Sequence, residues 1–518
     1  MEGERQMSFD ERYDAVVVGA GLGGLTSGAL LAKAGLKVLI VERQERPGGF
    51  AKSFERNGFT FQVPQFAYGC SPNGTARAIL DHLGVDVTFK PVDPYHRYIY
   101  PEHDLSIGTG LDSLEERLKE QFVPRTADIK AFFERIAKVS ELADPQALRH
   151  PYSPGSMFKS MKVAKEMLQE RTFEDVLDRT FEDDRLKSIV STAWPCAGSP
   201  PWEISSIAMM VQLARMDEGA HFPAGGFSAL SEALTDAYLG FGGSMLLGYE
   251  VTSINTEGGR ASGVETHPRS KVVCSSVISD ADSKRTLIKL VDRENFTSTL
   301  LEKVDSNPIS ISGFSVNLGL ESKVDRDGIA PGTIFYQPSY DLRAMADALA
   351  RPTEFPHPGT FPWMLTAHSL VEPSLAPPGC SSITITVPGV PYGFKRRWGV
   401  ESGGIRGDRY KEIKEKYAEI VVKSVSQIFP DLIKDVRAYD VCSPITYERY
   451  TMALDGCWSD SSQVPRQTLF LRPGPTTPLK GLYMAGSKSA TGGGVGPTIV
   501  SGLLAADCVL KGKFKELF

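Results

Sequence analysis

Cysteine is scarce in this chain, and it has no disulfide or metal-binding spacing. The seven cysteines among 518 residues are scattered, odd in number and never form a Cys-x-x-Cys pair. This usage argues against a disulfide framework and a zinc site, and it fits a reducing compartment. The eight histidines are dispersed as well, so we expect no metal centre.

A basic charge excess and long apolar runs are lacking too. The 57 Lys and Arg against 63 Asp and Glu give a net charge of −6, which argues against a nucleic-acid partner because such binding needs a cationic surface. The uncharged stretches 373–394 and 489–506 are interrupted by proline or glycine. Neither is the run of about 20 apolar residues that a spanning helix needs. Residues 1–12 are polar and charged, so we expect no signal peptide and a cytoplasmic location.

The first strong pattern lies near the N-terminus. Residues 13–18 (YDAVVV) are typical of a buried strand, and residues 19–24 (GAGLGG) fit the Gly-x-Gly-x-x-Gly turn that opens a helix. Residues 25–34 then predict that helix, and residues 37–41 predict a second strand that ends at Glu42. Strand, glycine turn, helix, strand and acid in this order predict a dinucleotide-binding unit.

Each part of this unit has a mechanical reason. Gly19 permits the tight turn, Gly21 lets the backbone approach a pyrophosphate, and Gly24 permits close helix packing. The free N–H groups of the helix start favour phosphates, and Glu42 is expected to accept hydrogen bonds from the ribose hydroxyls. The cofactor-binding residues predicted here are Gly19, Gly21, Leu22, Gly23, Gly24 and Glu42.

The segment after Glu42 distinguishes FAD from NAD. Arg43 is followed by Pro47-Gly48-Gly49-Phe50, a turn that brings bare backbone beside the cofactor. Here the chain resembles the flavoprotein superfamily of amine oxidases, phytoene desaturases and GDP-dissociation inhibitors. The resemblance implies FAD as cofactor, with Arg43, Gly48, Gly49, Phe50 and Ala51 added to its site.

The C-terminal end carries a second turn of this type. Residues 481–486 predict a strand that runs into a turn, residues 492–497 (GGGVGP) are rich in glycine, and residues 498–510 predict an apolar helix. In the resembled superfamily this segment closes over the flavin. The resemblance therefore implies contacts from Gly486, Ser487, Gly496, Pro497 and Thr498.

Two further stretches narrow the resemblance. Residues 222–230 (FPAGGFSAL) begin a helix that reaches about residue 239, and residues 277–282 read VISDAD. This order is similar to the phytoene desaturase, carotenoid isomerase and retinol saturase group, in which Val251 would hold the adenine edge. Four positions depart from the pattern of this group. Gln62 and Ser487 stand where an acid is frequent, Pro64 stands where glycine is usual, and Thr491 stands where proline is frequent.

The fold class predicted is α/β: a discontinuous Rossmann-type FAD-binding domain with an inserted substrate domain of mixed sheet and helices. Residues 1–75, 220–294 and 440–518 are assigned to the first domain, and residues 76–219 and 295–439 to the second. In the inserted part, residues 115–143 and 409–429 have helical periodicity, and residues 309–320 and 381–387 alternate like strands.

Two apolar groups in the middle of the chain leave alternatives open. Residues 156–169 form a basic amphipathic pattern that either lies on a membrane surface or, more often, faces a core. Peripheral membrane contact therefore stays open. The second group consists of Trp194, Trp202, Met209 and Met210. These residues either line an apolar channel or pack in a core, and core packing is favoured.

No hydrolase, metalloprotease or P-loop motif is present, so the chemistry falls to the flavin. We expect an FAD-dependent oxidoreductase that acts on C–C bonds of a small apolar polyene or isoprenoid-like substrate by desaturation, saturation or isomerisation. The chain has no second Gly-x-Gly-x-x-Gly unit, so we expect no separate NAD(P)H domain. No catalytic side chain is assigned from the sequence. The alternatives are an amine oxidase-like flavoenzyme and a non-catalytic prenyl-binding chaperone that resembles GDP-dissociation inhibitors.

Overall fold

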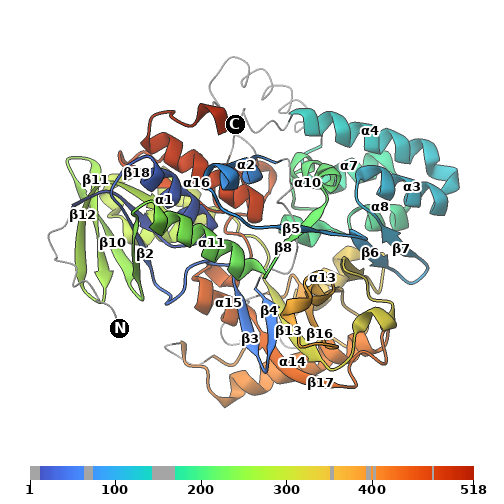
Figure 1. Cartoon of the computed structure of the whole chain (residues 1–518). Helices are drawn as coiled ribbons and strands as arrows, with labels where there is room; N and C mark the ends of the chain where they lie inside the picture. The colour runs from blue at the N-terminus through green and yellow to red at the C-terminus, as the bar shows by residue number, and fades with distance from the viewer. Residues whose placement is uncertain are drawn as a thin grey trace.

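The computed structural model describes residues 12–63, 74–142, 170–350, 355–391, 398–400, 404–468, 472–489 and 491–517. Two seven-stranded sheets and a group of helices make up the molecule (Figure 1). Residues 156–169, for which membrane contact was left open, lie outside the described residues. The six cysteines among the described residues are all free thiols.

The first sheet combines strands from both chain ends with four strands from residues 244–279 in the middle of the chain. Its order is β10-β11-β12-β1-β2-β9, and β18 pairs with β12. The pairs that join β18, β12, β1, β2 and β9 are parallel, whereas β10 and β11 form an antiparallel arm. The strands are β1 Arg12–Val18, β2 Val38–Glu42, β9 Ser244–Leu247, β10 Glu250–Glu257, β11 Arg260–His267, β12 Ser270–Ser279 and β18 Leu482–Met484.

Three helices cover this sheet side by side in Figure 1: α1 (Leu22–Lys33), α11 (Phe227–Gly240) and α16 (Val495–Val509). α1 and α16 come from opposite ends of the chain and touch almost backbone to backbone. A Cβ added at Gly502 would lie 2.6 Å from the carbonyl oxygen of Gly23. Small residues therefore allow the two predicted cofactor segments to meet. α2 (Thr75–His82) packs against α16.

The second sheet is mixed, as predicted. Its order is β17-β13-β16-β15-β14-β6-β7, and only the β14–β6 pair is parallel. Its strands are β6 His96–Ile99, β7 Asp104–Ile107, β13 Gly313–Leu320, β14 Thr333–Tyr336, β15 Trp363–Thr366, β16 Ser381–Pro388 and β17 Val436–Cys442.

The strands predicted at residues 309–320 and 381–387 correspond to β13 and β16, although the first begins at Gly313. Every residue of β13 and β16 is buried, because both faces of these central strands are covered. α14 (Asp408–Ser426) packs on β13. The hairpin of β3 (Ser53–Arg56) and β4 (Phe59–Gln62) supplies the ring of Phe59, which would lie 2.5 Å from a Cβ at Gly319.

Helices form the remaining lobe, at the right of Figure 1. The helical stretch predicted at 115–143 is two helices, because the turn Val123–Arg125 contains Pro124 and separates them. A two-stranded sheet of β5 (Phe89–Val92) and β8 (Ala220–Pro223) leads from this lobe to α11. The helices are α3 Leu111–Gln121, α4 Thr126–Leu142, α7 Phe173–Thr180, α8 Asp184–Val190, α9 Trp194–Ala197 and α10 Ser206–Ala214.

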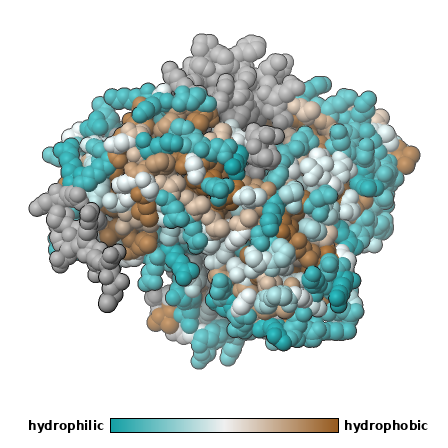
Figure 2. All heavy atoms as spheres, viewed as in Figure 1, coloured by the Kyte–Doolittle hydropathy of each residue, from teal (hydrophilic) through white to brown (hydrophobic). Residues whose placement is uncertain are grey.

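Three shorter helices complete the described structure: α12 Ser298–Ser306 packs in the core of the first sheet, and α13 Leu342–Ala350 and α15 Pro444–Thr451 pack in the core of the second. Among the described residues, the search for a helix with the length and apolarity to cross a membrane found none. Hydrophilic residues cover much of the rim of the face in Figure 2. The most exposed large apolar side chains come from separate segments: Val123, Ile405 and Tyr450.

Candidate cofactor and active site

The carboxyl ends of the parallel strands meet at one edge of the first sheet. The chain that leaves each strand is tied to its neighbour there: Asp280 N donates to Val18 O over 2.8 Å, and Ala485 N donates to Ser279 O over 2.9 Å. Gly48 N donates to Ala20 O over 2.7 Å. A cavity of about 380 Å³ opens at this edge, which is the usual ligand position in an open parallel sheet.

Most of the predicted cofactor residues line this cavity. From the N-terminal motif these are Gly19, Gly21, Leu22, Glu42, Arg43, Gly48, Gly49, Phe50 and Ala51, and from later segments Val251, Gly486, Ser487, Pro497 and Thr498. The structure therefore brings together segments more than 400 positions apart in the sequence.

Three predicted residues lie behind the lining and act through packing. A Cβ at Gly24 would lie 2.1 Å from Gly19 O, and one at Gly23 would lie 2.6 Å from Gly486 N. Gly496 is buried in the first turn of α16. Their smallness holds α1, the Gly19 turn and the Gly486 turn together, so they shape the site without facing it.

Two helix N-termini with glycine N-caps open into the cavity. α1 has Gly21 as its N-cap and α16 has Gly494, so neither N-cap residue supplies a side-chain hydrogen bond, and at α1 the Asp280 carboxylate accepts from the backbone of Gly24 and Gly21. Free N–H groups and the helix dipole favour anionic or electronegative groups at both ends. This arrangement fits a dinucleotide whose pyrophosphate lies at one helix start and whose ring oxygens lie at the other. α16 begins at Val495 rather than at the predicted residue 498.

Glu42 is held in place before any ribose reaches it. The side chain is 9% exposed, and its two oxygens accept from Ala20 N and Gln44 N, each over 2.8 Å. Since a carboxylate has about four acceptor positions, others remain for ribose hydroxyls. Arg43 turns to α15, where its guanidinium donates to the Arg449 carbonyl oxygen over 2.6 Å.

Gln62 has a structural role at its position. Its Oε1 accepts from Ser53 Oγ over 2.8 Å and from Phe227 N over 2.9 Å, so it ties the β3–β4 hairpin to the start of α11. Its Nε2 is buried without a hydrogen-bond partner among the described residues. An amide therefore supports the fold here, and Gln62 does not line the cavity.

Comparison with known proteins agrees with this geometry. Residues 17–83 match the family model of an NAD(P)-binding Rossmann-like domain, and residues 396–510 match that of flavin containing amine oxidoreductases. Both matched segments of this chain contain residues that line the cavity. This chain is an FAD-dependent oxidoreductase.

Two curated relatives span nearly the whole oxidoreductase. Prolycopene isomerase 2 of an Oncidium hybrid cultivar is 26% identical, with 96% of this chain and 83% of the relative covered. Phytoene desaturase (lycopene-forming) of Pantoea ananas is 25% identical, with 96% and 98% covered. A solved structure of a putrescine oxidase triple mutant is 15% identical with a TM-score of 0.66, and covers 96% of this chain and 99% of its own. That last likeness shows the fold alone.

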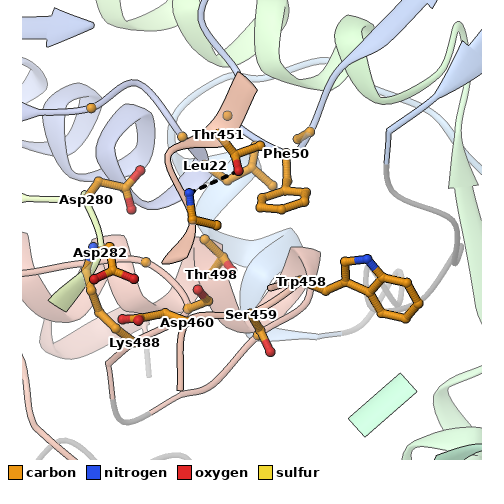
Figure 3. A pocket seen from close by; sticks show the side chains of 18 of the residues that line it. Leu22, Phe50, Asp280, Asp282, Thr451, Trp458, Ser459, Asp460, Lys488 and Thr498 are labelled. Atoms are coloured by element: carbon orange, nitrogen blue, oxygen red, sulfur yellow. Dashed lines mark hydrogen bonds between the residues drawn. The ribbon is translucent and has the colours of Figure 1, made fainter. Parts of the chain in front are cut away.

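A cluster of charged side chains that the sequence did not reveal lines one side of the flavin cavity. Figure 3 shows Asp280, Asp282, Asp460 and Lys488 gathered there, away from Phe50 and Trp458. Lys488 is 3% exposed and donates to the carbonyl oxygen of Ala281. Burial lowers the pKa of the Lys488 ammonium, against the opposite effect of the three carboxylates.

The pKa values of two carboxyl groups in this cluster, Asp280 and Asp460, are raised. Burial raises the pKa of Asp280 to about 6, although Lys488 and hydrogen bonds from the backbone of Gly24 and Gly21 lower it. Burial and the adjacent Asp282 raise the pKa of Asp460. Asp280 therefore lies at the anion-attracting start of α1, where a bound pyrophosphate would be its neighbour.

Only part of this cluster had a signal in the sequence. Asp280 and Asp282 stand in the VISDAD segment, but no pattern gave them a role, and Lys488 simply follows Ser487. Asp460 comes from a loop beyond α15 that the fold places against Ser283, whose N–H donates to it over 3.0 Å.

The cavity continues from the cofactor residues towards the helical lobe. The residues that line this end come from the start of β6, from α9, from the end of α10 and from a late loop: Tyr95, Pro195, Cys196, Ala197, Gly198, Gln212, Arg215 and Trp458. Trp194, Met209 and Met210 are in the core instead, and Trp202 lies under the guanidinium of Arg343. The structure therefore supports packing, rather than the lining of an apolar channel, for these four residues. No group of metal-ligating side chains was found in the described part of the chain.

Proposed function

We propose that this flavoenzyme acts on C–C bonds of an apolar, polyene or isoprenoid-like substrate, by desaturation, saturation or isomerisation. The observation that carries the proposal is one continuous cavity, which joins the two helix starts to a lining of Tyr95, Pro195, Ala197 and Trp458. The two relatives bear names of enzymes of polyene isomerisation and desaturation. Each buried CH₂ of such a substrate contributes about 0.8 kcal/mol.

The cofactor and the chain have separate tasks in this proposal. When bound, FAD supplies a ring that takes up or returns a hydride. Glu42 and the helix starts of α1 and α16 hold the dinucleotide, while the lobe side of the cavity holds the apolar chain and excludes water. The aromatic and aliphatic side chains there orient the substrate by shape, since few polar contacts are available to an apolar chain.

The proposed domains follow the two sheets. Residues 1–75, 220–294 and 440–518 bind FAD, and residues 76–219 and 295–439 bind substrate. β17 (Val436–Cys442) pairs with β13 of the second sheet, so we place the last border after Cys442. Substrate would then lie where the two domains meet, a frequent location of ligand pockets.

Anaerobic reaction of the purified holoenzyme tests the proposal. A polyene should either bleach the flavin absorption or change its own isomer composition on chromatography, whereas putrescine should do neither. Bleaching by putrescine alone would assign an amine oxidase instead. A purified protein without flavin absorption that does not take up added FAD would point to the binding chaperone.

A further inference from the structure

The lobe end of the cavity carries two polar side chains one helical turn apart. Gln212 lies in the last turn of α10 (Ser206–Ala214), and Arg215 opens the short 3-10 turn that follows it (Arg215–Glu218). Positions three apart share one face of a helix. Both residues are partly buried and line the cavity, so the guanidinium and the amide face the same space.

Neither side chain has a partner in the described part of the chain. The hydrogen bonds and ion pairs of the described residues include none from the Arg215 guanidinium or the Gln212 amide. Burial lowers the pKa of the Arg215 guanidinium, while Glu218 and Tyr95 raise it. Glu218 is exposed and lines the same cavity, but no ion pair links it to Arg215 among the described residues. A desolvated cation without a partner is unfavourable unless a ligand supplies the anion.

The contrast with Arg472 shows what a structural arginine looks like here. Arg472 is buried, and its guanidinium donates to the carbonyl oxygens of Ser489 and Ser487, each over 2.8 Å, and of Ser461 over 3.1 Å. Lys488 is surrounded by carboxylates in the same way. Arg215 differs from both because its donors are left to the cavity.

We infer that Arg215 and Gln212 bind a carboxylate on the substrate, so the preferred substrate is an apolar chain that ends in an acid. This inference rests on the proposed function and adds the polar end of the substrate to it. A guanidinium presents parallel N–H donors that match the two oxygens of a carboxylate, and Gln212 offers a further N–H. An alcohol or an ester would leave the charge unpaired, and an amine would be repelled by it.

The test uses the holoenzyme and three polyenes of the same chain: retinoic acid, its methyl ester and retinol. Binding is followed by the change in flavin absorption. Wild type should bind the acid about 10- to 100-fold more tightly than the ester, the range for a hydrogen bond to a charged group. Arg215→Gln should remove this preference and leave ester binding within about twofold, and Arg215→Lys should restore part of it.

Controls separate this inference from folding and from the proposed function. Arg117→Gln, on α3 of the same lobe with a half-exposed side chain paired to Glu120, should change nothing. Gln212→Met should reduce acid binding about threefold to tenfold, which keeps the test open if the arginine variants lose flavin. Equal binding of acid and ester by wild type, or a preference kept in Arg215→Gln, overturns the inference. Turnover of a neutral polyene would then still support the proposed function, whereas no binding of any polyene would count against both.

Discussion

The two ends of the cavity offer different means of recognition. The cofactor end is built from backbone: two helix starts capped by Gly21 and Gly494, and turns at Gly19 and Gly48 that have positive φ. The lobe end is built from side chains of distant segments, among them Tyr95, Arg215 and Trp458. Backbone recognition requires glycine at fixed spacing, whereas side-chain recognition only requires that the fold brings suitable residues together.

The Lys488 cluster is the exception at the cofactor end, because it relies on side chains. Lys488→Met should lower the free energy of unfolding by about 3–5 kcal/mol, the cost of leaving buried charges uncompensated. The loss should be larger at about pH 8 than at about pH 5. Burial raises the pKa of Asp280 from 3.8 to about 6, so its ionisation opposes folding increasingly between these two pH values and fully above the second, and removal of the Lys488 ammonium makes that ionisation more costly. Thermal unfolding at both pH values measures the effect.

The control for this variant is Lys411→Met. Lys411 is 68% exposed and pairs with Asp408 on the surface of α14, so its loss should cost less than about 1 kcal/mol at either pH. Equal losses for Lys488→Met at the two pH values would show that the carboxylates of the cluster do not respond to the lysine charge.

Gly24→Ala tests whether the cofactor end depends on the absence of a Cβ. The new Cβ would lie 2.1 Å from Gly19 O, so the turn between β1 and α1 must open. We expect a loss of about 1–3 kcal/mol in stability and little FAD retained after purification. Gly240→Ala, where a Cβ meets open space at the end of α11, is the matched control. Normal flavin content in Gly24→Ala would show that FAD binding does not depend on the absence of a Cβ at this turn.

Glu42→Ala tests the single acid expected to read the ribose. We expect FAD binding to weaken about 10- to 100-fold, because a charged acceptor contributes about 1.5–3 kcal/mol. Titration of the apoprotein with FAD, followed by fluorescence quenching, gives the dissociation constant. The control is Glu45→Ala at a nearby exposed position, which should leave FAD affinity unchanged. Unchanged FAD affinity in Glu42→Ala would contradict the proposed contact between Glu42 and the ribose.

Asp280→Asn should have the smallest effect. Since burial raises the pKa of Asp280 to about 6, the group is ionised at about pH 8 and repels a pyrophosphate at the start of α1 by about 1 kcal/mol. FAD affinity of the wild type should therefore fall about fivefold between about pH 5 and pH 8. The Asn variant should show a flatter profile in the same fluorescence titration. A parallel pH dependence in both proteins would contradict the assignment.

Much of the cofactor end was predictable from local sequence. The Gly19–Gly24 turn, Glu42 and the Gly48-Gly49 pair each lie within a few residues of a strand or a helix start, so a short-range pattern predicts them together, and most of them line one cavity. The charged cluster was not predictable. Asp280, Asp460 and Lys488 come from three separate segments, and the sequence around each residue does not predict that it lies close to the other two.

The middle of the chain shows a second limit. β13 and β16 alternate in polarity along the sequence, yet every residue of both strands is buried because α14 and the β3–β4 hairpin cover them. Alternation along a strand reports side-chain polarity, and serine and threonine are accepted in a core when they find partners there. Thr384 Oγ1 in β16 donates to Asn317 Oδ1 in β13 over 2.9 Å, which explains how such a strand is buried.

The amino-acid sequence by itself determined the cofactor class and the α/β architecture, because a phosphate-binding turn needs glycine and a helix start in immediate succession. Only the tertiary structure decided which charges meet. It enclosed Lys488 among carboxylates and left Arg215 facing the cavity, because burial and distance between remote segments set the energy of a charge.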